Sequence, residues 1–548
     1  MGNMIYPDVN ECRALIIDSN QTSRSILASM LRDMGVVFIT QTRGIVEARR
    51  ALENSVFDIV LCEYHFENSP ESGQDLLGDL RRSQLMPYST VFIMVTGEAS
   101  YQFVAEAAEA AMDSYLLKPH TSASLEQRLL QARHRKKVLK PIFDAIERNE
   151  LDRAAGLCIE RFTAKGEFYF YCARIGADLL LKQNKSGFAK RLYIAVNEER
   201  PAAWSKLGIA RAQIEENQIG LAKKTLENLI TEEPSYADAY DLLGQVQVEL
   251  GELEAAMHTY RQATEITPYS ITRLQKQGML AYFMNEIDEA EQVFDRSVRL
   301  GISSKMFDSL TLVFLGLIQY DKRETKSFQR TYDNLAIAAE QNLKNKRMQS
   351  FAGILSALKC VLERTPAAGV RSVSELASEI KMEHFDFECA SNFISLISRL
   401  KNTDMLLPEA DNWIKKISDR FCTSKFSVEM LCKSSIKYEA YYSIIKSSYA
   451  DIANMAETAM AHSAAGSPTE AVKLLMIYGK ETLNSKLIDL AGMVLNKHET
   501  NIQNSEFLNQ IISDLKTKFC KKANYVSLGG KVGRVAGGLN LRQRVTVE

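Results

Sequence analysis

The chain has 548 residues, more than one hydrophobic core ordinarily organises, so several domains are expected. Lys plus Arg number 67 against 68 Asp plus Glu, which excludes a global electrostatic field that would favour nucleic acid, a membrane surface or an acidic substrate. The nine cysteines form no C-x-x-C pair, and neither a signal-peptide pattern nor a run of ~18 apolar residues occurs, so we expect a cytoplasmic protein with reduced thiols.

Short apolar runs alternate with amphipathic stretches through the first 130 residues. The runs lie at residues 14–18, 36–40, 58–64, 90–96 and 114–119. They predict parallel strands buried on both faces with helices between them, that is, a doubly wound α/β domain over residues 11–130. Ligands of such sheets bind beyond the carboxyl ends of the strands. Four polar residues fall at these predicted ends: Asp18, Glu63, Thr96 and Lys118.

A period of about 34 residues, typical of helical repeats, begins near residue 133. Small and large residues recur with this period as pairs four positions apart: Ala155 and Ile159, Ala189 and Tyr193, Ala222 and Leu226, Ala256 and Tyr260, and Ala290 and Phe294. Prolines at 201, 234 and 268 keep the same period and end each second helix. The pattern predicts an all-α solenoid of helical hairpins over residues 133–301. Because no Pro/Gly/Ser linker precedes it, we expect rigid coupling to the α/β domain.

The period fades after residue 300, although helical patterns continue. We expect residues 303–520 to form divergent helical hairpins. The tail, residues 521–548, is rich in glycine and carries six Lys or Arg against one Glu, which predicts disorder. Its GGKVG sequence lacks phosphate-loop spacing, and no catalytic motif set occurs elsewhere. We therefore expect neither enzymatic activity nor a cofactor.

Residues 11–130 resemble the receiver domain of bacterial two-component response regulators. ALIIDSN supplies Asp18 but has Ser19 where receivers carry a second acidic residue, and DIVLCEYH has Glu63 at the phosphoacceptor aspartate. VTGEAS and YLLKP match the family's later motifs. The resemblance implies that Thr96 hydrogen-bonds a phosphoryl group and that Lys118 pairs with it.

By the same resemblance, Tyr115 is the aromatic residue that changes rotamer on activation. Glu63 extends its carboxylate one methylene further, about 1.5 Å, and serine is a poorer Mg²⁺ ligand than aspartate. We therefore expect little or no phosphorylation and no metal, Asp18 and Glu63 being the weak Mg²⁺ candidates.

Three interpretations of the receiver pocket stay open. Glu63 forms a structural ion pair with Lys118 in an inert module, or it imitates a phosphoryl group permanently, or the pocket retains residual phosphorylation or metal binding. Permanent imitation predicts that Glu63→Gln shifts partner binding while leaving the fold intact.

The repeats resemble tetratricopeptide repeats, most clearly over residues 203–301, which implies a concave groove for a protein partner. The family's groove positions fall on Asp238, Asp241, Gln245, Glu249, Gln275, Met279 and Tyr282. This set lacks the lysines and asparagine of a carboxylate clamp and favours a basic or polar segment. An alternative occupant is the chain's own tail, which carries Arg534, Arg542 and Arg544.

These features together predict a signal-transduction adaptor with a degenerate receiver domain and a protein-binding helical array. One alternative is a phosphorylation-controlled response regulator whose output is the array, and another is nucleic-acid binding through the basic tail. The receiver resemblance also makes a homodimer reasonable. No membrane association is expected.

Overall fold

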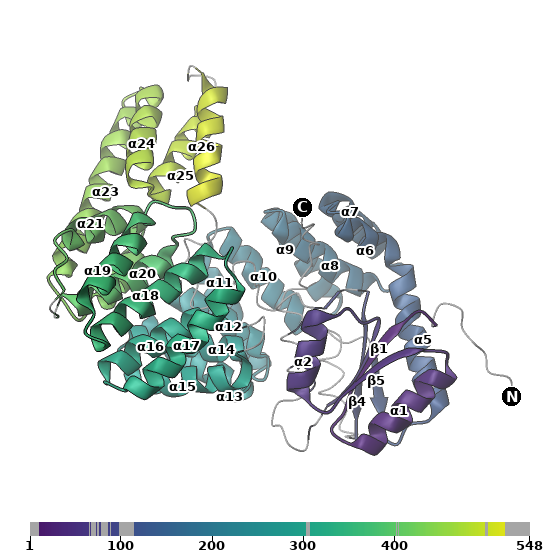
Figure 1. Ribbon diagram of the computed structural model, residues 1–548. Helices are drawn as coiled ribbons and strands as arrows, with labels where there is room; N and C mark the ends of the chain where they lie inside the picture. Colours follow the sequence, from purple (N-terminus) through teal and green to yellow (C-terminus); the bar gives the residue numbers. More distant parts are fainter. Residues whose placement is uncertain are drawn as a thin grey trace. The chain divides into compact units, whose positions relative to one another are not determined.

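The computed structural model describes residues 10–64, 66, 73, 76–77, 80, 86–87, 89–97, 114–302, 307–401, 403, 405–498, 502 and 504–520. The predicted disordered tail, residues 521–548, lies outside this described part. The chain forms two compact units (Figure 1), with their boundary inside one helix, between Leu274 and Gln275; Arg299–Phe307 belongs to the first unit. The predicted domain boundaries do not coincide with this division and stay predictions.

The first unit begins with a five-stranded parallel sheet of order β2-β1-β3-β4-β5. The strands are β1 (Arg13–Ile17), β2 (Phe38–Thr42), β3 (Ile59–Glu63), β4 (Val91–Thr96) and β5 (Ser114–Leu117). Every residue of β4 is buried, as expected for a strand covered on both faces. The predicted α/β fold with its five strands is therefore confirmed.

Helices cover both faces of this sheet. One core packs α1 (Gln21–Asp33) and α5 (Ser122–Val138) on alternate strand residues such as Ile16 and Ile93. The opposite core packs α2 (Ile45–Asn54) on the intervening residues, such as Leu15. Neighbouring strand residues point to opposite faces of the sheet, so successive residues of one continuous apolar run contribute to the two cores in turn.

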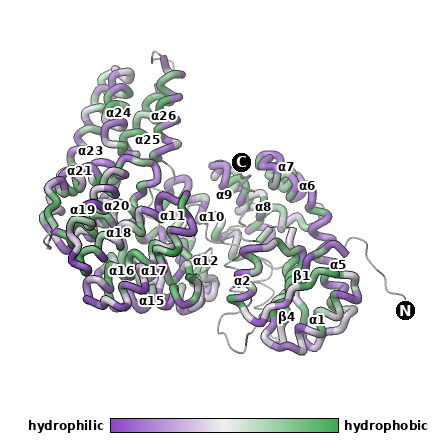
Figure 2. The backbone as a smooth tube through the Cα atoms, viewed as in Figure 1, coloured by the Kyte–Doolittle hydropathy of each residue, from purple (hydrophilic) through white to green (hydrophobic). Residues whose placement is uncertain are grey.

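Helix α5 leads directly into the helical array. It starts at a capping box in which Thr121 and Ser124 exchange hydrogen bonds, and its C-cap Leu139 is also the N-cap of α6 (Lys140–Glu147). The next helices of the first unit are α7 (Leu151–Thr163), α8 (Tyr169–Lys182), α9 (Ser186–Glu199), α10 (Ala203–Glu215), α11 (Ile219–Glu232), α12 (Ala237–Glu249) and α13 (Leu253–Ile266). Figure 2 shows hydrophobic and hydrophilic residues mixed along them. Helix α11 buries one face, with Ala222, Leu226 and Leu229, whereas α8 is buried without a break from Cys172 to Leu181.

A turn residue in the left-handed region marks the hairpins of the array. Asn149, Asn184, Asn217 and Asn285 have φ near +60°, and Gly251 takes the same place with φ +78°. Asparagine and glycine tolerate this conformation better than other residues. These turns keep the period near 34 residues and explain why the irregularity near Asn217 does not break the register.

The glycines of the first helices allow close helix approach. A Cβ on Gly208 would lie 2.3 Å from the ring of Tyr193, and one on Gly244 would lie 2.5 Å from Tyr260. In α14 (Ile271–Phe283) a Cβ on Gly278 would lie 2.6 Å from Phe294. In three of the five predicted small-and-large pairs, the large residue thus fills the space that the glycine leaves. Ile159, the large residue of the first pair, is instead exposed.

The second unit is helical throughout its described residues. After most of α14 it contains α15 (Ile287–Gly301), whose last residues belong to the first unit, followed by α16 (Leu310–Asp321), α17 (Thr325–Gln341), α18 (Lys346–Leu362), α19 (Pro366–Ser378), α20 (Phe387–Leu400), α21 (Ala410–Phe421), α22 (Lys425–Ser434), α23 (Tyr441–Ala464), α24 (Pro468–Thr482), α25 (Ser485–Lys497) and α26 (Ser505–Phe519). No helix among the described residues is long and apolar enough to cross a membrane.

A repeated polar bridge shows that the hairpin architecture continues where the sequence period fades. Thr259 donates a 2.8 Å hydrogen bond to Gln247 across the α12–α13 hairpin. Thr331 makes the same bond, also 2.8 Å, to Gln319 across α16–α17. The hairpin therefore persists after residue 303 although its small-and-large residue pattern does not.

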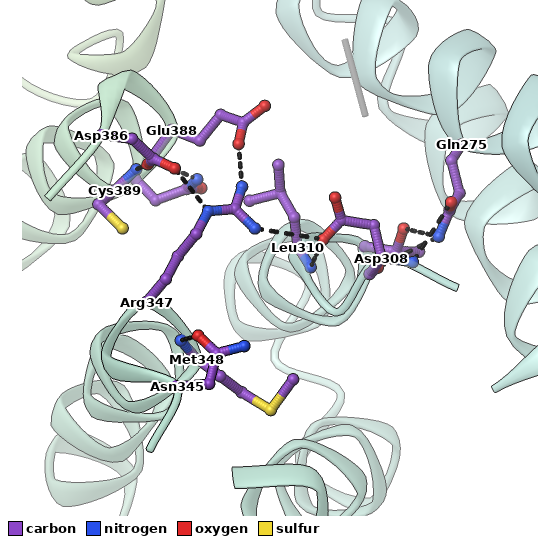
Figure 3. Close-up of polar contacts among 11 residues, drawn as sticks. Gln275, Asp308, Leu310, Asn345, Arg347, Met348, Asp386, Glu388 and Cys389 are labelled. Atoms are coloured by element: carbon purple, nitrogen blue, oxygen red, sulfur yellow. Dashed lines mark hydrogen bonds and ion pairs between the residues drawn. The ribbon is translucent and has the colours of Figure 1, made fainter. Parts of the chain in front are cut away.

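One half-buried arginine joins three segments of the second unit (Figure 3). Arg347, at the start of α18, contacts Asp308 before α16 and both Asp386 and Glu388 at the start of α20. Asp386 also caps α20 by accepting a hydrogen bond from the Cys389 amide. Because these side chains are largely buried, one cation balances three carboxylates in a poorly solvated place.

Candidate functional site

The carboxyl edge of the sheet gathers the strand-end residues predicted from the sequence. Asp18 follows β1, Glu63 ends β3 and Thr96 ends β4. Lys118 follows β5, and its backbone amide donates to the Thr96 carbonyl at 2.7 Å. Parallel strands place all their carboxyl ends at one edge, which is why residues a hundred positions apart become neighbours.

Lys118 is already paired with two carboxyl groups. Its Nζ lies 2.5 Å from Glu63 Oε1 and 3.1 Å from Asp18 Oδ2. The side chains of Lys118, Glu63 and Asp18 are 26%, 14% and 1% exposed. Such a poorly solvated ammonium pair is stronger than one at the surface.

Asp18 has hydrogen-bond partners on both carboxylate oxygens. The Asn20 amide donates to Oδ1 at 2.8 Å, and the Ser23 hydroxyl donates to Oδ2 at 2.6 Å. Below it, Arg24 Nη1 donates to the backbone carbonyls of Asp18 and Ser19, at 2.6 and 3.0 Å. The first turn of α1, capped by Asn20, positions all of these groups.

The pKa values of the two carboxyl groups shift in opposite directions. Burial and the hydrogen bond to Asp18 raise the pKa of Glu63 to about 7, against the opposing effect of Lys118. Burial also acts to raise the pKa of Asp18, but hydrogen bonds from Glu63, Ser23, Asn20 and Lys118 outweigh it and lower this pKa. The same two carboxyl groups raise the pKa of Lys118 against its burial. Near neutral pH, Glu63 is the group that gains or loses the proton.

Other pocket residues are placed differently. Thr96 is buried at the end of β4, and the half-buried Ser19 contributes its backbone carbonyl to Arg24. Tyr115 points its hydroxyl to Arg128 Nη2 at 3.2 Å, with the guanidinium 4.5 Å from the ring centroid. His120 has a lowered pKa because of its burial and the positive Lys118.

Sequence reasoning missed Ser23, Arg24 and Arg128. Ser23 and Arg24 lie five and six positions after Asp18, so a helix starting at residue 21 carries them back to the strand end. This helical spacing was the available signal. Arg128 gave no local signal, because its partner lies on a different element.

The described donor set does not fit a Mg²⁺ ion. Mg²⁺ needs oxygen ligands in octahedral positions, whereas both Asp18 oxygens are engaged and Ser19 replaces an acidic residue. Among the described residues, no group of three or more His, Cys, Asp or Glu could hold a metal.

The predicted groove residues divide into buried and accessible side chains. Asp241 and Asp238 both pair with the buried Arg273, at 2.9 and 2.7 Å. Gln275 bonds Thr311 at 2.8 Å. Met279 is only 1% exposed, and the Tyr282 hydroxyl accepts a hydrogen bond from Arg399. These five side chains are therefore engaged within their own units, which does not support the prediction that they line an open groove.

Gln245 and Glu249 are the accessible remainder of that set. Gln245 is exposed, Glu249 is half-buried, and Gln245 Nε2 donates to Glu249 Oε1 at 3.2 Å. Burial, with a contribution from the negative Glu215, raises the pKa of Glu249. An acidic position beside another acidic residue favours a cationic group on any partner.

Known proteins resemble two segments of the chain. The response regulator receiver domain family matches residues 14–130, and the tetratricopeptide repeat family matches residues 237–270, which form the α12–α13 hairpin. The chemotaxis protein CheY-3 of Vibrio cholerae is 31% identical over 117 residues, 88% of its own length and 21% of this chain. The chemotaxis protein CheY of Pseudomonas aeruginosa is 29% identical over 117 residues, 92% of its length and 21% of this chain.

A solved signal receiver domain of an HD domain-containing protein from Pseudomonas fluorescens covers 23% of this chain and 98% of its own. It has 22% identity and a TM-score of 0.21. The family match, the Vibrio relative and the observed strand order agree on the same N-terminal residues. Through residues 14–130, the chain belongs to the response regulator receiver family.

Proposed function

We propose that this protein is a cytoplasmic signal-transduction adaptor whose receiver pocket is closed by its own side chains and whose helical array binds a protein partner, without catalysis. A receiver domain joined to a tetratricopeptide repeat supports a signalling protein that acts through protein contacts. Asp18, Ser19, Glu63, Thr96, Tyr115 and Lys118 make up the proposed pocket.

The pairing of Lys118 carries this proposal. Its ammonium lies within hydrogen-bond distance of both Glu63 and Asp18 in a largely buried place. Phosphoryl transfer depends on positioned cations that neutralise the transferred group. A lysine that already has two acidic partners leaves an incoming phosphoryl group without that neutralisation, and the pocket lacks the donor set for Mg²⁺.

The alternative is a phosphorylation-controlled response regulator with the array as its output. The relatives named for chemotaxis make a two-component context reasonable for this chain. The two functions differ in whether a phosphoryl donor modifies the protein or beryllofluoride alters its receiver. Homodimerisation through the receiver is compatible with either.

The array half of the proposal concerns Gln245 and Glu249. We expect the double variant Gln245→Lys/Glu249→Lys of the full chain to lose a protein that wild type retains from native cytosol, because a basic segment would meet like charge. Glu254→Lys on the neighbouring helix α13 is the control, since Glu254 is exposed and its substitution brings the same change of charge as Glu249→Lys.

Mass spectrometry of the retained proteins gives the readout. Equal retention by wild type and the double variant would contradict the assignment of these two residues. Recovery of nucleic acid alone would support the tail-binding alternative instead.

A further inference from the structure

Helix α5 belongs to two structures at once. Its buried residues Leu125 and Leu129 complete the core of the receiver sheet. Its last residue, Val138, packs against the core that includes Cys158 of α7 and Cys172 of α8. A single continuous helix (Figure 1) therefore connects the receiver to the first array hairpins, with no flexible linker between them.

The receiver end of α5 is held by two arginines. Arg128 lies over the ring of Tyr115 and donates to its hydroxyl, as described above. Arg133 Nη1 lies 3.2 Å from the Cys12 sulfur, just before β1. Tyr115 lies in β5, the strand that ends just before Lys118, so α5 contacts the receiver close to the pocket.

The array end of α5 is held by the loop that joins α7 to α8. His134 lies 3.0 Å from Glu167 and packs edge-on against the Phe168 ring at 6.1 Å between centroids. The Arg135 guanidinium lies 4.9 Å from the centroid of the Tyr171 ring. We call these five residues, His134, Arg135, Glu167, Phe168 and Tyr171, the α5 clamp.

The backbone of this loop is strained. Lys165 and Phe168 have φ of +49° and +62°, a region that residues with long or bulky side chains rarely adopt. Phe168 is also the N-cap of α8 and provides no side-chain cap. Arg323 and Arg364 take similar φ values at other turns of the array, so the bulky Phe168 distinguishes this loop more than Lys165 does. The loop is also held by Lys165 with Glu199 of α9, at 3.0 Å, and by Arg161 of α7, which donates to the Glu167 carbonyl at 3.1 Å. The contacts that α5 adds are those of the α5 clamp.

We propose that the α5 clamp is a coupling device: α5 holds residues 164–168 in their strained conformation, so a shift of α5 in the receiver releases this loop and loosens the start of α8. The array thereby senses the receiver without any change in the connecting backbone. This inference goes beyond the proposed adaptor function and needs no partner for its test.

Hydrogen exchange of the full chain, followed by mass spectrometry, tests the device. Arg128→Ala removes the contact with Tyr115 and touches no clamp residue. We expect amide exchange in residues 164–171 to rise at least roughly fivefold, while exchange in α11, which does not contact α5, stays unchanged. Arg191→Ala is the matched control, because Arg191 makes a similar contact with the Phe188 ring, at 4.5 Å, away from α5.

Unchanged exchange in residues 164–171, or an equal rise with Arg191→Ala, would overturn the proposal. Should Arg128→Ala unfold the receiver, uniform exchange of its strands would reveal this. Arg128→Gln would then carry the test, because it removes the cation over the ring but keeps a long polar side chain.

A second variant isolates the strain. Lys165→Gly removes one backbone penalty without altering the clamp side chains, but it also removes the ion pair of Lys165 with Glu199. Lys165→Ala, which removes the ion pair and keeps the penalty, is therefore its control. The response of residues 164–171 to Arg128→Ala should shrink with Lys165→Gly and not with Lys165→Ala. An undiminished response would contradict the role given to the strain. Because no partner is involved, failure here leaves the capture experiment on the array unaffected.

Discussion

Two carboxyl groups and one ammonium meet at the receiver pocket, so the charge of this pocket depends on a proton. Glu63, with its pKa raised to about 7, is neutral in a large fraction of molecules at physiological pH. Permanent imitation of a phosphoryl group needs a full negative charge there, whereas a structural role needs only the contact with Lys118. The raised pKa therefore favours the structural interpretation of Glu63.

The raised pKa has a consequence for stability. The folded state holds the Glu63 proton more tightly than the unfolded chain, in which the pKa of Glu63 is 4.5. This contribution is fully present below pH 4.5 and is lost as pH rises through about 7. Glu63→Gln imitates the protonated group. From pH 5 to pH 8, the free energy of unfolding of wild type should therefore decrease by roughly 1 to 2 kcal/mol relative to that of this variant. Thermal unfolding of both proteins across this range is the measurement. A difference in stability that does not change with pH would contradict the raised pKa of Glu63.

Ser23 offers a second test at this scale. Its hydroxyl is a 2.6 Å donor to the buried Asp18 carboxylate. Removing a hydrogen bond to a charged group costs about 1.5 to 3 kcal/mol, so Ser23→Ala should lower the stability of the receiver by that order. Ser25→Ala is the control, since Ser25 donates only to the Gln21 carbonyl on an exposed face. Equal unfolding midpoints for the two variants would mean that the hydrogen bond from Ser23 to Asp18 does not stabilise the receiver.

At the scale of elements, helix contacts in the array depend on single glycines. Gly208→Ala would drive a Cβ into Tyr193, and overpacking of this kind costs about 1 to 3 kcal/mol. Gly156→Ala in the interior of α7 meets nothing within 4 Å and should instead stabilise the chain by roughly 0.5 to 1 kcal/mol. Chemical denaturation followed by circular dichroism gives the change in unfolding free energy for each variant. A change of the same sign in both variants would contradict the packing described.

For the second unit, the contacts of Arg347 in Figure 3 predict a loss of stability when this residue is replaced. Arg347→Met leaves Asp308, Asp386 and Glu388 without their shared cation, at a cost of about 3 to 5 kcal/mol for a broken buried pair. Lys415→Met, which breaks two largely exposed pairs with Asp419 and Asp451, should cost less than about 1 kcal/mol. Hydrogen exchange at the start of α18 and α20 distinguishes them. Similar protection in both variants would mean that Arg347 does not join these helices.

The elements were predictable from the sequence where one local rule decides them. Parallel strands place Asp18, Glu63 and Lys118 at one edge whatever the details of packing, and the spacing of small and large residues predicts the hairpins. The contacts of the proposed groove residues could not be predicted, because they depend on non-local pairs: Asp241 pairs with Arg273, which lies 32 residues away in α14. The hairpins after residue 303 contain polar bridges such as that of Thr331 with Gln319. A pattern of small and large apolar residues does not reveal such bridges.

At the scale of the whole molecule, the receiver and the array form one mechanical system through α5. The pocket closes on its own lysine, α5 packs on both the sheet and the first hairpins, and the accessible Gln245 and Glu249 lie on a repeat three hairpins further on. This arrangement suits a protein that transmits contacts rather than one that transfers a group.

We expect that the receiver pocket, closed by Glu63, does not accept a phosphoryl group. The intact mass of the full chain after incubation with acetyl phosphate and Mg²⁺ tests this, beside the double variant Ser19→Asp/Glu63→Asp, which restores the acidic residues of the receiver family. Wild type should keep its mass while the double variant gains a phosphoryl group. Phosphorylation of wild type to the extent of the double variant would instead establish a phosphorylation-controlled regulator.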